Sequence, residues 1–260
     1  MSLARRHRDR VLAAQTVLAT DPASAPDGGA DAASAADSFP AAGAAQIVLR
    51  LTHDLRRLKE IKSVDAKISA KREMLPEYGS WVLGLLEADT GVGNGLSAEV
   101  LPTIMVWLID VGNYDEALEL LPFLLKHRVQ MPARYKRDAA TVAIEEIADA
   151  ALKALGLGAS FPLEVLARVT ELTDGLDVHD EVRAKLAKAI GIAGLALAEE
   201  LPAEEARAAL QGALSALLEA QRLNDRAGVK DKIKRAEKLL AALDTAATPP
   251  ASDTAGGPAA

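Results

Sequence analysis

The sequence predicts an all-α protein of antiparallel helix pairs, partly tetratricopeptide-like, preceded by a long basic amphipathic helix and flanked by disordered tails. Three observations predict this fold class. Hydrophobic residues make up 50% of the 260 residues but aromatic residues only 3%, so the core must be aliphatic. Apolar residues recur at steps of three and four, which places them on one side of a helix. No segment alternates convincingly with period two, so no strands are predicted.

The composition also excludes several classes of protein. The chain has no cysteine, which rules out disulfides and thiolate metal sites and fits a reducing cytoplasm. No apolar run approaches the roughly 20 residues that cross a bilayer, and the N-terminus lacks the apolar core of a signal peptide. We therefore expect a soluble, cytoplasmic protein with no membrane partner.

Residues 1–44 are predicted to form a basic N-terminal arm and a flexible tether. The stretch ARRHRDRVLAAQTVL joins a run of cations to an apolar, helix-prone end, which indicates a short basic helix or arm. Residues 21–43 consist almost entirely of Ala, Ser, Asp, Gly and Pro, which is typical of a linker. The tether would let the arm reach a distant surface. The alternative is that the arm is a solvated terminus.

Residues 45–97 are predicted to form a basic helical segment for DNA binding or oligomerisation. An apolar stripe winds along one helix over 47–75 until Pro76 stops or kinks it, and consists of Ile47, Leu51, Leu55, Leu58, Ile61 or Val64, and Ile68. The other faces carry eight Lys and Arg against four Asp and Glu, a net charge of +4. An apolar turn over 78–86 follows. The break at 89–97 has no preceding strand and no Lys-Ser or Lys-Thr, so it is not a phosphate-binding loop.

Residues 98–245 are predicted to form a helical-repeat-like domain, and 246–260 a disordered tail. Residues 98–126 are predicted to form a helix, a turn at Gly112-Asn113 and a second helix. Trp107, Tyr114, Ala117 and the closing Met131-Pro132 have the spacing of one tetratricopeptide unit. A looser echo runs over 186–223, with Gly191, Ala206, Ala213 and Leu217. Further helices are predicted at 134–155, 161–174, 178–201, 202–223 and 229–243.

Positive charge is concentrated near the N-terminus of a chain whose net charge is −7. Residues 1–75 hold 12 Lys and Arg against 9 Asp and Glu, whereas the remainder holds 18 against 28. Such a protein can still bind DNA, because phosphate attraction is local on the scale of a Debye length, about 8–10 Å. The last helix adds a second basic surface formed by Arg222, Arg226, Lys230, Lys232, Lys234, Arg235 and Lys238.

No catalytic constellation is evident in the sequence. Nothing resembles a Ser–His–acid triad, and no two of the four histidines have the spacing of metal ligands on one helical face; they are His7, His53, His127 and His179. The best carboxylate group for a two-metal nuclease is Glu145, Glu146 and Asp149, with Asp110 and Asp115 around the preceding turn. Acids on an exposed helix face are usually solvated, and no nuclease motif surrounds these.

Several stretches occur in the order found in one known family. They are RRHRDRVLAA, LRRLKEIKSVDAKISAKREMLPEYGSWVLGLL, LPTIMVWLIDVGNYDEALELL, MPARYKRDAATVAIEEIADAAL, DEVRAKL and AGVKDKIKRAEKLL. Together they cover most of residues 4–240 and resemble the small terminase subunit of temperate contractile-tailed phages, often labelled terminase endonuclease subunit. The lysine-rich tail with which members of this family often finish is missing here.

The resemblance implies that the protein takes part in packaging phage DNA into the procapsid, in the bacterial host cytoplasm. It implies duplex phage DNA and the large terminase subunit as partners, and a ring-like homo-oligomer. The apolar stripe is a plausible seam for this ring, although it could equally pack within its own protomer. In terminases, ATP hydrolysis and cutting usually belong to the large subunit, so the endonuclease label can describe the complex.

Basic helices with few aromatics suit the phosphates of duplex DNA better than unpaired bases, and the alternative is a coiled-coil helix kept soluble by its cations. The residues predicted to bind DNA are Arg5, Arg6, Arg8, Arg10, Arg50, Arg56, Arg57, Lys59, Lys62, Lys67, Lys71 and Arg72.

Two other functions stay open at this point. The same fold could carry a metal site at the three carboxylates and make the cohesive-end cut itself, and magnesium is expected as a cofactor only in that case. The chain could instead be a tetratricopeptide-like adaptor that binds only proteins.

Overall fold

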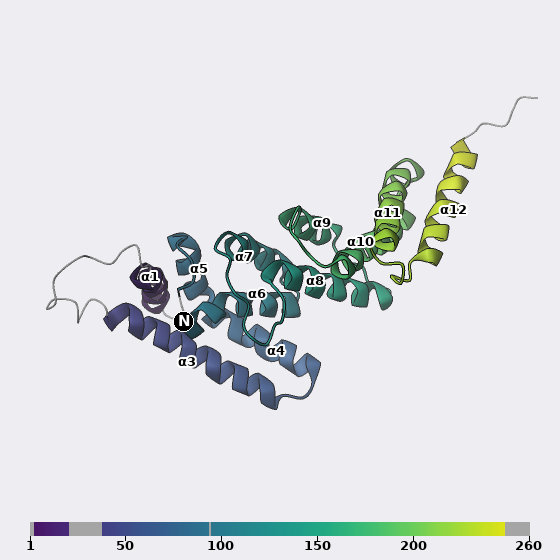
Figure 1. Cartoon of the computed structure of the whole chain (residues 1–260). Coiled ribbons are helices and arrows are strands. Elements are labelled where there is room, and N and C mark those ends of the chain that lie inside the picture. Colours follow the sequence, from purple (N-terminus) through teal and green to yellow (C-terminus); the bar gives the residue numbers. More distant parts are fainter. Residues whose placement is uncertain (1–2, 21–37, 94, 248–260) are drawn as a thin grey trace, which may run out of the picture. The chain divides into compact units, whose positions relative to one another are not determined.

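The computed structural model describes residues 3–20, 38–93 and 95–247, and the elements in these residues are helical, with no strand among them (Figure 1). This confirms the all-α prediction. The chain divides into two compact units, Met1–Ile147 with Ala167–Val178, and Ala148–Leu166 with His179–Ala260. None of the described helices is long and apolar enough to cross a membrane.

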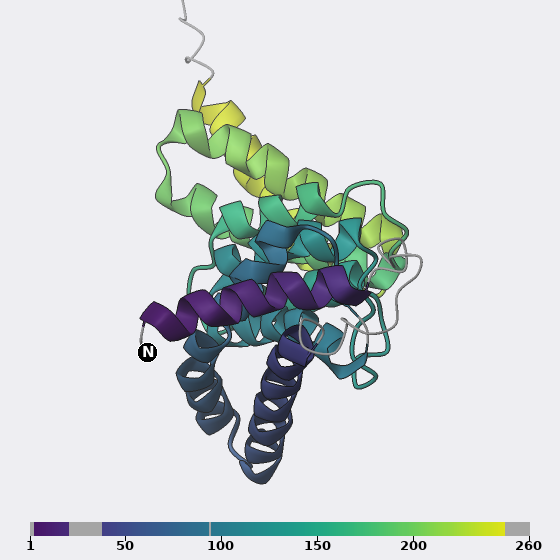
Figure 2. The same ribbon diagram turned by 90° about the vertical axis from the view of Figure 1, so that its left-hand side faces the viewer.

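The N-terminal helix α1 (Leu3–Thr20) packs against α5 (Gly79–Ala88) and lies across the beginning of α3 (Ser38–Glu60) (Figure 2). Contact with α5 is close because Gly84 has no side chain. A Cβ atom at Gly84 would lie 2.3 Å from the carbonyl oxygen of Arg10 and 2.8 Å from Cβ of Ala13. The basic N-terminal segment is therefore a docked helix.

The tether predicted over 21–43 is wrong at its C-terminal end, because α3 already begins at Ser38. Residues 21–37 lie outside the described residues. Gly43 explains part of the difference, since a Cβ atom there would lie 2.8 Å from Cβ of Leu12 in α1. A small residue that weakens a helix in isolation is favoured here by close helix packing.

The single helix predicted over 47–75 is also wrong, because α3 ends at Glu60 and α4 (Val64–Met74) is a separate helix. Ser63 has an extended backbone, and its Oγ accepts a hydrogen bond from Ala66 N at 3.4 Å, which caps α4. Figure 2 shows α3 and α4 as two arms joined at residues 61–63. Met74 of the second arm is buried, whereas Val64, a candidate for the predicted apolar stripe, is 63% exposed.

The centre of the first unit is an aliphatic core around two large aromatic residues. Tyr78 follows the short helix η2 (Leu75–Glu77), is fully buried, and meets Trp107 edge to face with a centroid distance of 5.8 Å. Its hydroxyl donates to Asp54 Oδ2 at 2.8 Å, which ties α3 to this core. Burial and the hydrogen bond to Asp54 both raise the pKa of Tyr78.

Helix α6 (Val100–Val111) follows η3 (Gly95–Glu99) and is buried along most of its length. It is joined to α7 (Tyr114–Lys126) at Gly112, whose φ of 87° allows the predicted turn. The two helices pack as an antiparallel pair, and the tetratricopeptide spacing stays a prediction. The next helix, α8 (Ala139–Gly156), begins later than predicted, because Asp138 caps it through Thr141 N at 3.0 Å.

The second unit contains α10 (Asp180–Glu200), α11 (Ala203–Leu223) and α12 (Lys230–Ala247), and α9 (Leu163–Leu172) is divided between the units. Helices α10 and α11 form a closely packed antiparallel pair. A Cβ atom at Gly191 would lie 2.5 Å from Cγ of Leu217, so a glycine in α10 admits a leucine of α11. Lys188 Nζ donates to the carbonyl of Ala227 at 2.7 Å and holds the turn before α12.

Replacing Gly84 by Ala should destabilise the docking of α1. The new Cβ atom would overlap backbone, which cannot rotate away, so we expect a loss of about 1–3 kcal/mol in the free energy of unfolding and faster proteolysis of α1. Gly79→Ala is the matched control on the same helix, because no atom lies within 4 Å of its Cβ position. Equal thermal stability of the two variants would contradict the packing described here.

Candidate nucleic-acid interface

The arginines predicted to bind DNA from the N-terminus lie on α1, and most of them contact carboxylates. Arg10 Nε donates to Glu87 Oε2 of α5, and Arg8 lies 3.9 Å from Asp9 on its own helix. Arg6 is exposed and has no ion pair among the described residues. The Arg10 pair spans two helices and so helps to fix α1 in place.

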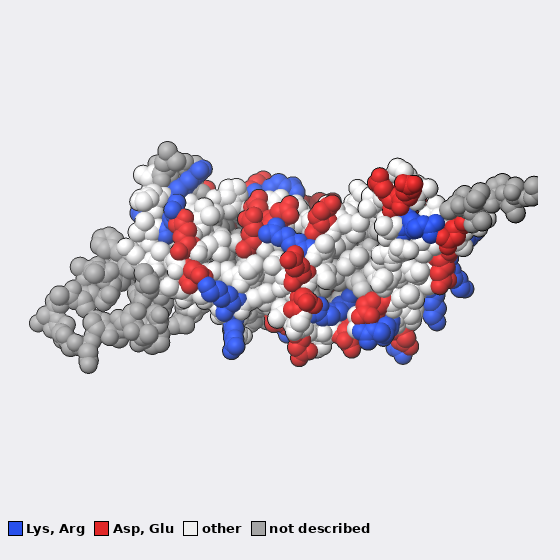
Figure 3. Space-filling model, turned by 90° about the horizontal axis from the view of Figure 1, so that it is seen from above, with Lys and Arg blue, Asp and Glu red and all other residues white. Residues whose placement is uncertain are grey.

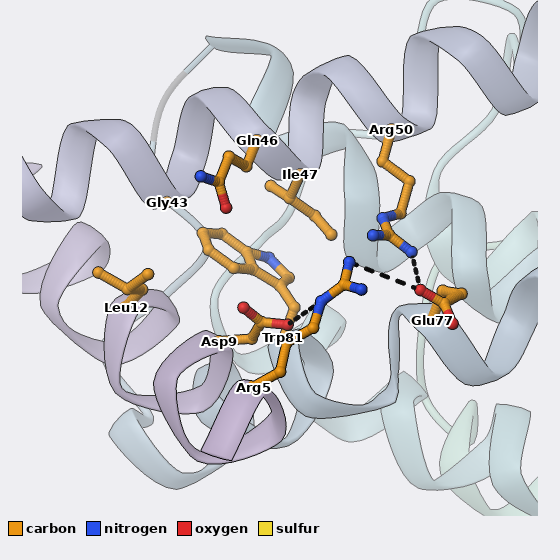
Figure 4. A pocket seen from close by; sticks show the side chains of 9 residues that line it. All are labelled: Arg5, Asp9, Leu12, Gly43, Gln46, Ile47, Arg50, Glu77 and Trp81. Carbon is orange, nitrogen blue, oxygen red and sulfur yellow. Dashed lines mark hydrogen bonds and ion pairs between the residues drawn. The ribbon is translucent and has the colours of Figure 1, made fainter. Parts of the chain in front are cut away.

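Two further arginines converge on one carboxylate, as Figure 4 shows. Arg50 of α3 donates to Glu77 Oε2, and Arg5 of α1 approaches the same oxygen at 3.8 Å while also lying 3.9 Å from Asp9. They line a cavity of about 40 Å³ beside Trp81. The hydrogen bond from Arg50 holds the pKa of Glu77 below its usual range. Arg5 and Arg50 therefore link α1 and α3 to η2 through Glu77 and are not free surface cations.

Two cations of α4 point toward the end of α6. Lys71 Nζ donates to Asp110 Oδ2, and the lysine side chain is only 16% exposed. Arg72 donates to the carbonyl oxygen of Val111 at 3.3 Å. Both contacts hold α4, the second arm of the hairpin that α3 and α4 form, against the core. Lys71 in particular is therefore poorly placed to reach an external phosphate.

The remaining cations gather near the junction of α3 and α4. Arg57 Nη2 donates to Glu73 Oε2 at 2.9 Å and so links the two arms. The others have no ion pair among the described residues, and we call them the hairpin tip: Arg56, Lys59, Lys62 and Lys67. Arg56, Lys59 and Lys62 are exposed, and Lys67 is half-buried. The predicted DNA-binding residues thus divide into a paired set that supports the fold and a hairpin tip that faces solvent.

Elsewhere, charges of both signs are interspersed. On the face drawn in Figure 3, Lys and Arg alternate with Asp and Glu. In the predicted second basic surface, Arg222 forms two hydrogen bonds of 2.7 Å with Glu219, and Arg235 pairs with Glu199. Its other cations have no ion pair among the described residues: Arg226, Lys230, Lys232, Lys234 and Lys238. Paired cations such as Arg222 and Arg235 contribute little to the attraction of a polyanion.

Two of the three carboxylates considered for a metal site, Glu145 and Asp149, are engaged by cations. Arg137 donates to Glu145 at 3.0 Å, and Lys185 donates to Asp149 at 3.0 Å. Glu146 is half-buried. Within the part of the chain that the structure describes, no group of three or more His, Asp or Glu is arranged to hold a metal ion.

The structure shows one basic segment that sequence reasoning missed, the α7–α8 loop at residues 127–138. With Lys126 it carries six basic side chains and one acid, but Pro and apolar residues separate the cations in the sequence. Lys126 and His127 Nε2 both contact Asp89, and the hydrogen bond from Lys126 is the main cause of the lowered pKa of Asp89. Counting charge along the loop, rather than along helix faces, would have found it.

Comparison with known proteins gives a consistent result. Residues 48–181 match the family described as phage small terminase subunit. The chain is 38% identical over 195 residues to the protein named "Terminase, endonuclease subunit" of Escherichia phage P2, and the match covers 75% of this chain and 73% of that protein. No solved structure matches the chain. The family match includes the hairpin tip and the α7–α8 loop.

The Glu77 ion pairs should make the docking of α1 sensitive to acid. Because the pKa of Glu77 is lowered in the folded state, its stabilising effect is present above the ordinary value of 4.5 and is lost as the pH falls through the lowered value. We expect Glu77→Gln to lower the melting temperature at neutral pH and to flatten its decline below about pH 4.5. Glu73→Gln, which removes the more exposed pair between Arg57 and Glu73, is the control. Plots of melting temperature against pH that run parallel for wild type and Glu77→Gln would contradict this account.

Proposed function

Because this chain belongs to the phage small terminase subunit family and so has a role in packaging phage DNA, we propose that it binds the packaging site on duplex DNA through the hairpin tip. It then delivers this DNA to the large ATPase subunit of the terminase and regulates that subunit. The observation that carries the DNA-binding part is the group of exposed, unpaired cations where α3 meets α4.

The composition of the hairpin tip supports duplex DNA as the ligand. Arg56 and Lys59 lie one helical turn apart on α3, and Lys62 follows in the junction, so their charges can meet neighbouring phosphates along one strand. Phe, Tyr and Trp, on which unpaired bases stack, are absent from residues 45–75. The hairpin therefore favours contacts with a phosphate backbone over stacking on single strands.

We also propose that the protein acts as a homo-oligomer, in keeping with the ring that the family resemblance implies. The apolar stripe does not supply the seam by itself, because Ile47, Leu51 and Leu58 are buried within the protomer. Leu49 and Val64 are the exposed apolar residues on the hairpin, at 69% and 63% exposure, and are available for contact with a second copy. A light-scattering mass equal to the 27.3 kDa monomer would rule out this oligomer.

A second candidate function rests on the name of the phage P2 relative, which includes endonuclease. In this alternative the subunit itself makes the cohesive-end cut with a bound metal. Magnesium-dependent nicking by the purified chain, lost when Glu145, Glu146 and Asp149 are all replaced by their amides, would favour it. The ion pairs of Glu145 and Asp149 favour a structural role for these acids.

Removing the charges of the hairpin tip should weaken DNA binding. For Arg56→Gln/Lys59→Gln/Lys62→Gln we expect the affinity for a duplex to fall about 10- to 100-fold at about 100 mM salt, with the salt slope reduced by about two to three. Fluorescence anisotropy over a salt series measures both quantities.

The neighbouring residues Arg56 and Arg57 provide an internal control. Arg56→Gln should weaken binding more than Arg57→Gln, because Arg57 is already paired with Glu73. Unchanged affinity and salt slope in the triple variant would reject the hairpin tip as the DNA-binding surface.

A further inference from the structure

We propose that the α7–α8 loop forms a second phosphate-binding groove, in which Arg128 and Lys136 contact the backbone of duplex DNA. This inference rests on the proposed function, because it names a further surface for the same ligand. The groove has a volume of about 460 Å³. Its lining includes the apolar residues Leu124, Val129 and Met131 together with the cations Arg128, Lys136 and Arg137.

Arg128 and Lys136 are the cations of this groove that stay available to a ligand. Both are exposed, and neither has an ion pair among the described residues. Arg137 is engaged by Glu145 at 3.0 Å. Asp138 is the acid in the lining, and Thr141 hydrogen-bonds both carboxylate oxygens, to Oδ1 at 3.0 Å and Oδ2 at 2.7 Å.

The carboxylate of Asp138 is therefore committed to capping α8. Burial alone would raise the pKa of Asp138, but the hydrogen bonds from Thr141 outweigh burial and hold the pKa below its usual range. This acid stays charged and turned toward its own helix terminus. Its negative charge lies at the start of α8, where the helix dipole favours it.

The loop is held in shape before any ligand binds. Arg134 Nη2 donates to Thr103 Oγ1, and its Nη1 lies 3.5 Å from Glu99 Oε2, so the middle of the loop is anchored to α6. A turn closes where Tyr135 N donates to the carbonyl of Pro132 at 2.8 Å. A groove that is already formed loses less conformational entropy when it binds a ligand.

The backbone at Arg128 has a conformation that glycine favours. Helix α7 ends with Val129 N donating to Leu124 O at 2.9 Å and Arg128 N donating to Leu125 O at 3.2 Å, which is a Schellman motif. This motif places Arg128 in the left-handed region, with φ of 48°.

Two other helices end with the same pair of hydrogen bonds, and both have glycine at the corresponding position. These glycines are Gly112 after α6 and Gly158 after α8, with φ of 87° and 77°. An arginine in this conformation is strained relative to glycine. Its presence at the rim of a cationic groove is explained if the guanidinium binds an anion.

Duplex DNA fits the groove better than a free nucleotide does. Tyr135 is the aromatic residue of the lining, and the guanidinium of Arg134 already lies over its ring, 5.0 Å from the centroid. The ring is therefore poorly placed to stack on a base. The loop also belongs to the same compact unit as the hairpin tip.

The experiment compares Arg128→Gly, Arg128→Lys and Lys136→Gln in the full chain. Arg128→Gly removes the charge and also the backbone strain, so we expect DNA affinity to fall about three- to tenfold and the salt slope to fall by about one, with a melting temperature that is unchanged or higher. Arg128→Lys keeps the charge and should retain affinity to within about threefold. Lys153→Gln, at an exposed lysine of α8, is the matched control and should leave binding unchanged.

Several outcomes would overturn the inference. One is an Arg128→Gly variant that loses stability and keeps wild-type affinity and salt slope, because Arg128 would then serve the fold. Another is saturable binding of ATP or inorganic phosphate that Arg128→Gly abolishes while DNA affinity is unchanged. If the wild type binds DNA and only the hairpin-tip variant binds it more weakly, the α7–α8 groove is rejected but the proposed function stands. If the wild type does not bind DNA at low salt, the proposed function fails as well.

Discussion

The ion pair between Arg50 and Glu77 is the interaction on which the N-terminal part of the structure depends. It joins α3 to the turn that leads into α5, and Arg5 of α1 approaches the same carboxylate. Glu77 thus holds together three segments that are distant in the sequence. Because Arg5 and Arg50 are paired with Glu77, they are not available to bind DNA phosphates. The number of positive residues in the sequence therefore overstates the basic surface of the folded protein.

Much of the fold could be predicted from the sequence because most helix ends are determined locally. Gly112 ends α6 at the expected place, and the all-α class follows from the spacing of aliphatic residues. The boundaries that were missed depend on tertiary packing or on a polar cap. Gly43 lies inside α3 because Leu12 packs against it, and Ser63 begins a new helix in the middle of a continuous apolar pattern.

The candidate site was less predictable because sequence shows which side chains are charged and not which of them are paired. Arg56 and Arg57 are neighbours of the same type, yet only Arg57 reaches Glu73 on the other arm. Lys71 looks like a surface lysine on a basic helix, but it pairs with Asp110, distant in the sequence. The basic character of the α7–α8 loop was not predicted because its cations lie between two helices and do not form a face of either one.

The close contact between Gly84 and the Arg10 carbonyl has a consequence for biosynthesis. Helix α1 emerges from the ribosome well before α5, the helix against which it docks. Until α5 has been translated, the arginines of α1 lack their carboxylate partners on Glu77 and Glu87. In the nascent chain, Arg5 and Arg10 therefore lack these partners while the segment lies near ribosomal RNA, and completion of α5 supplies them.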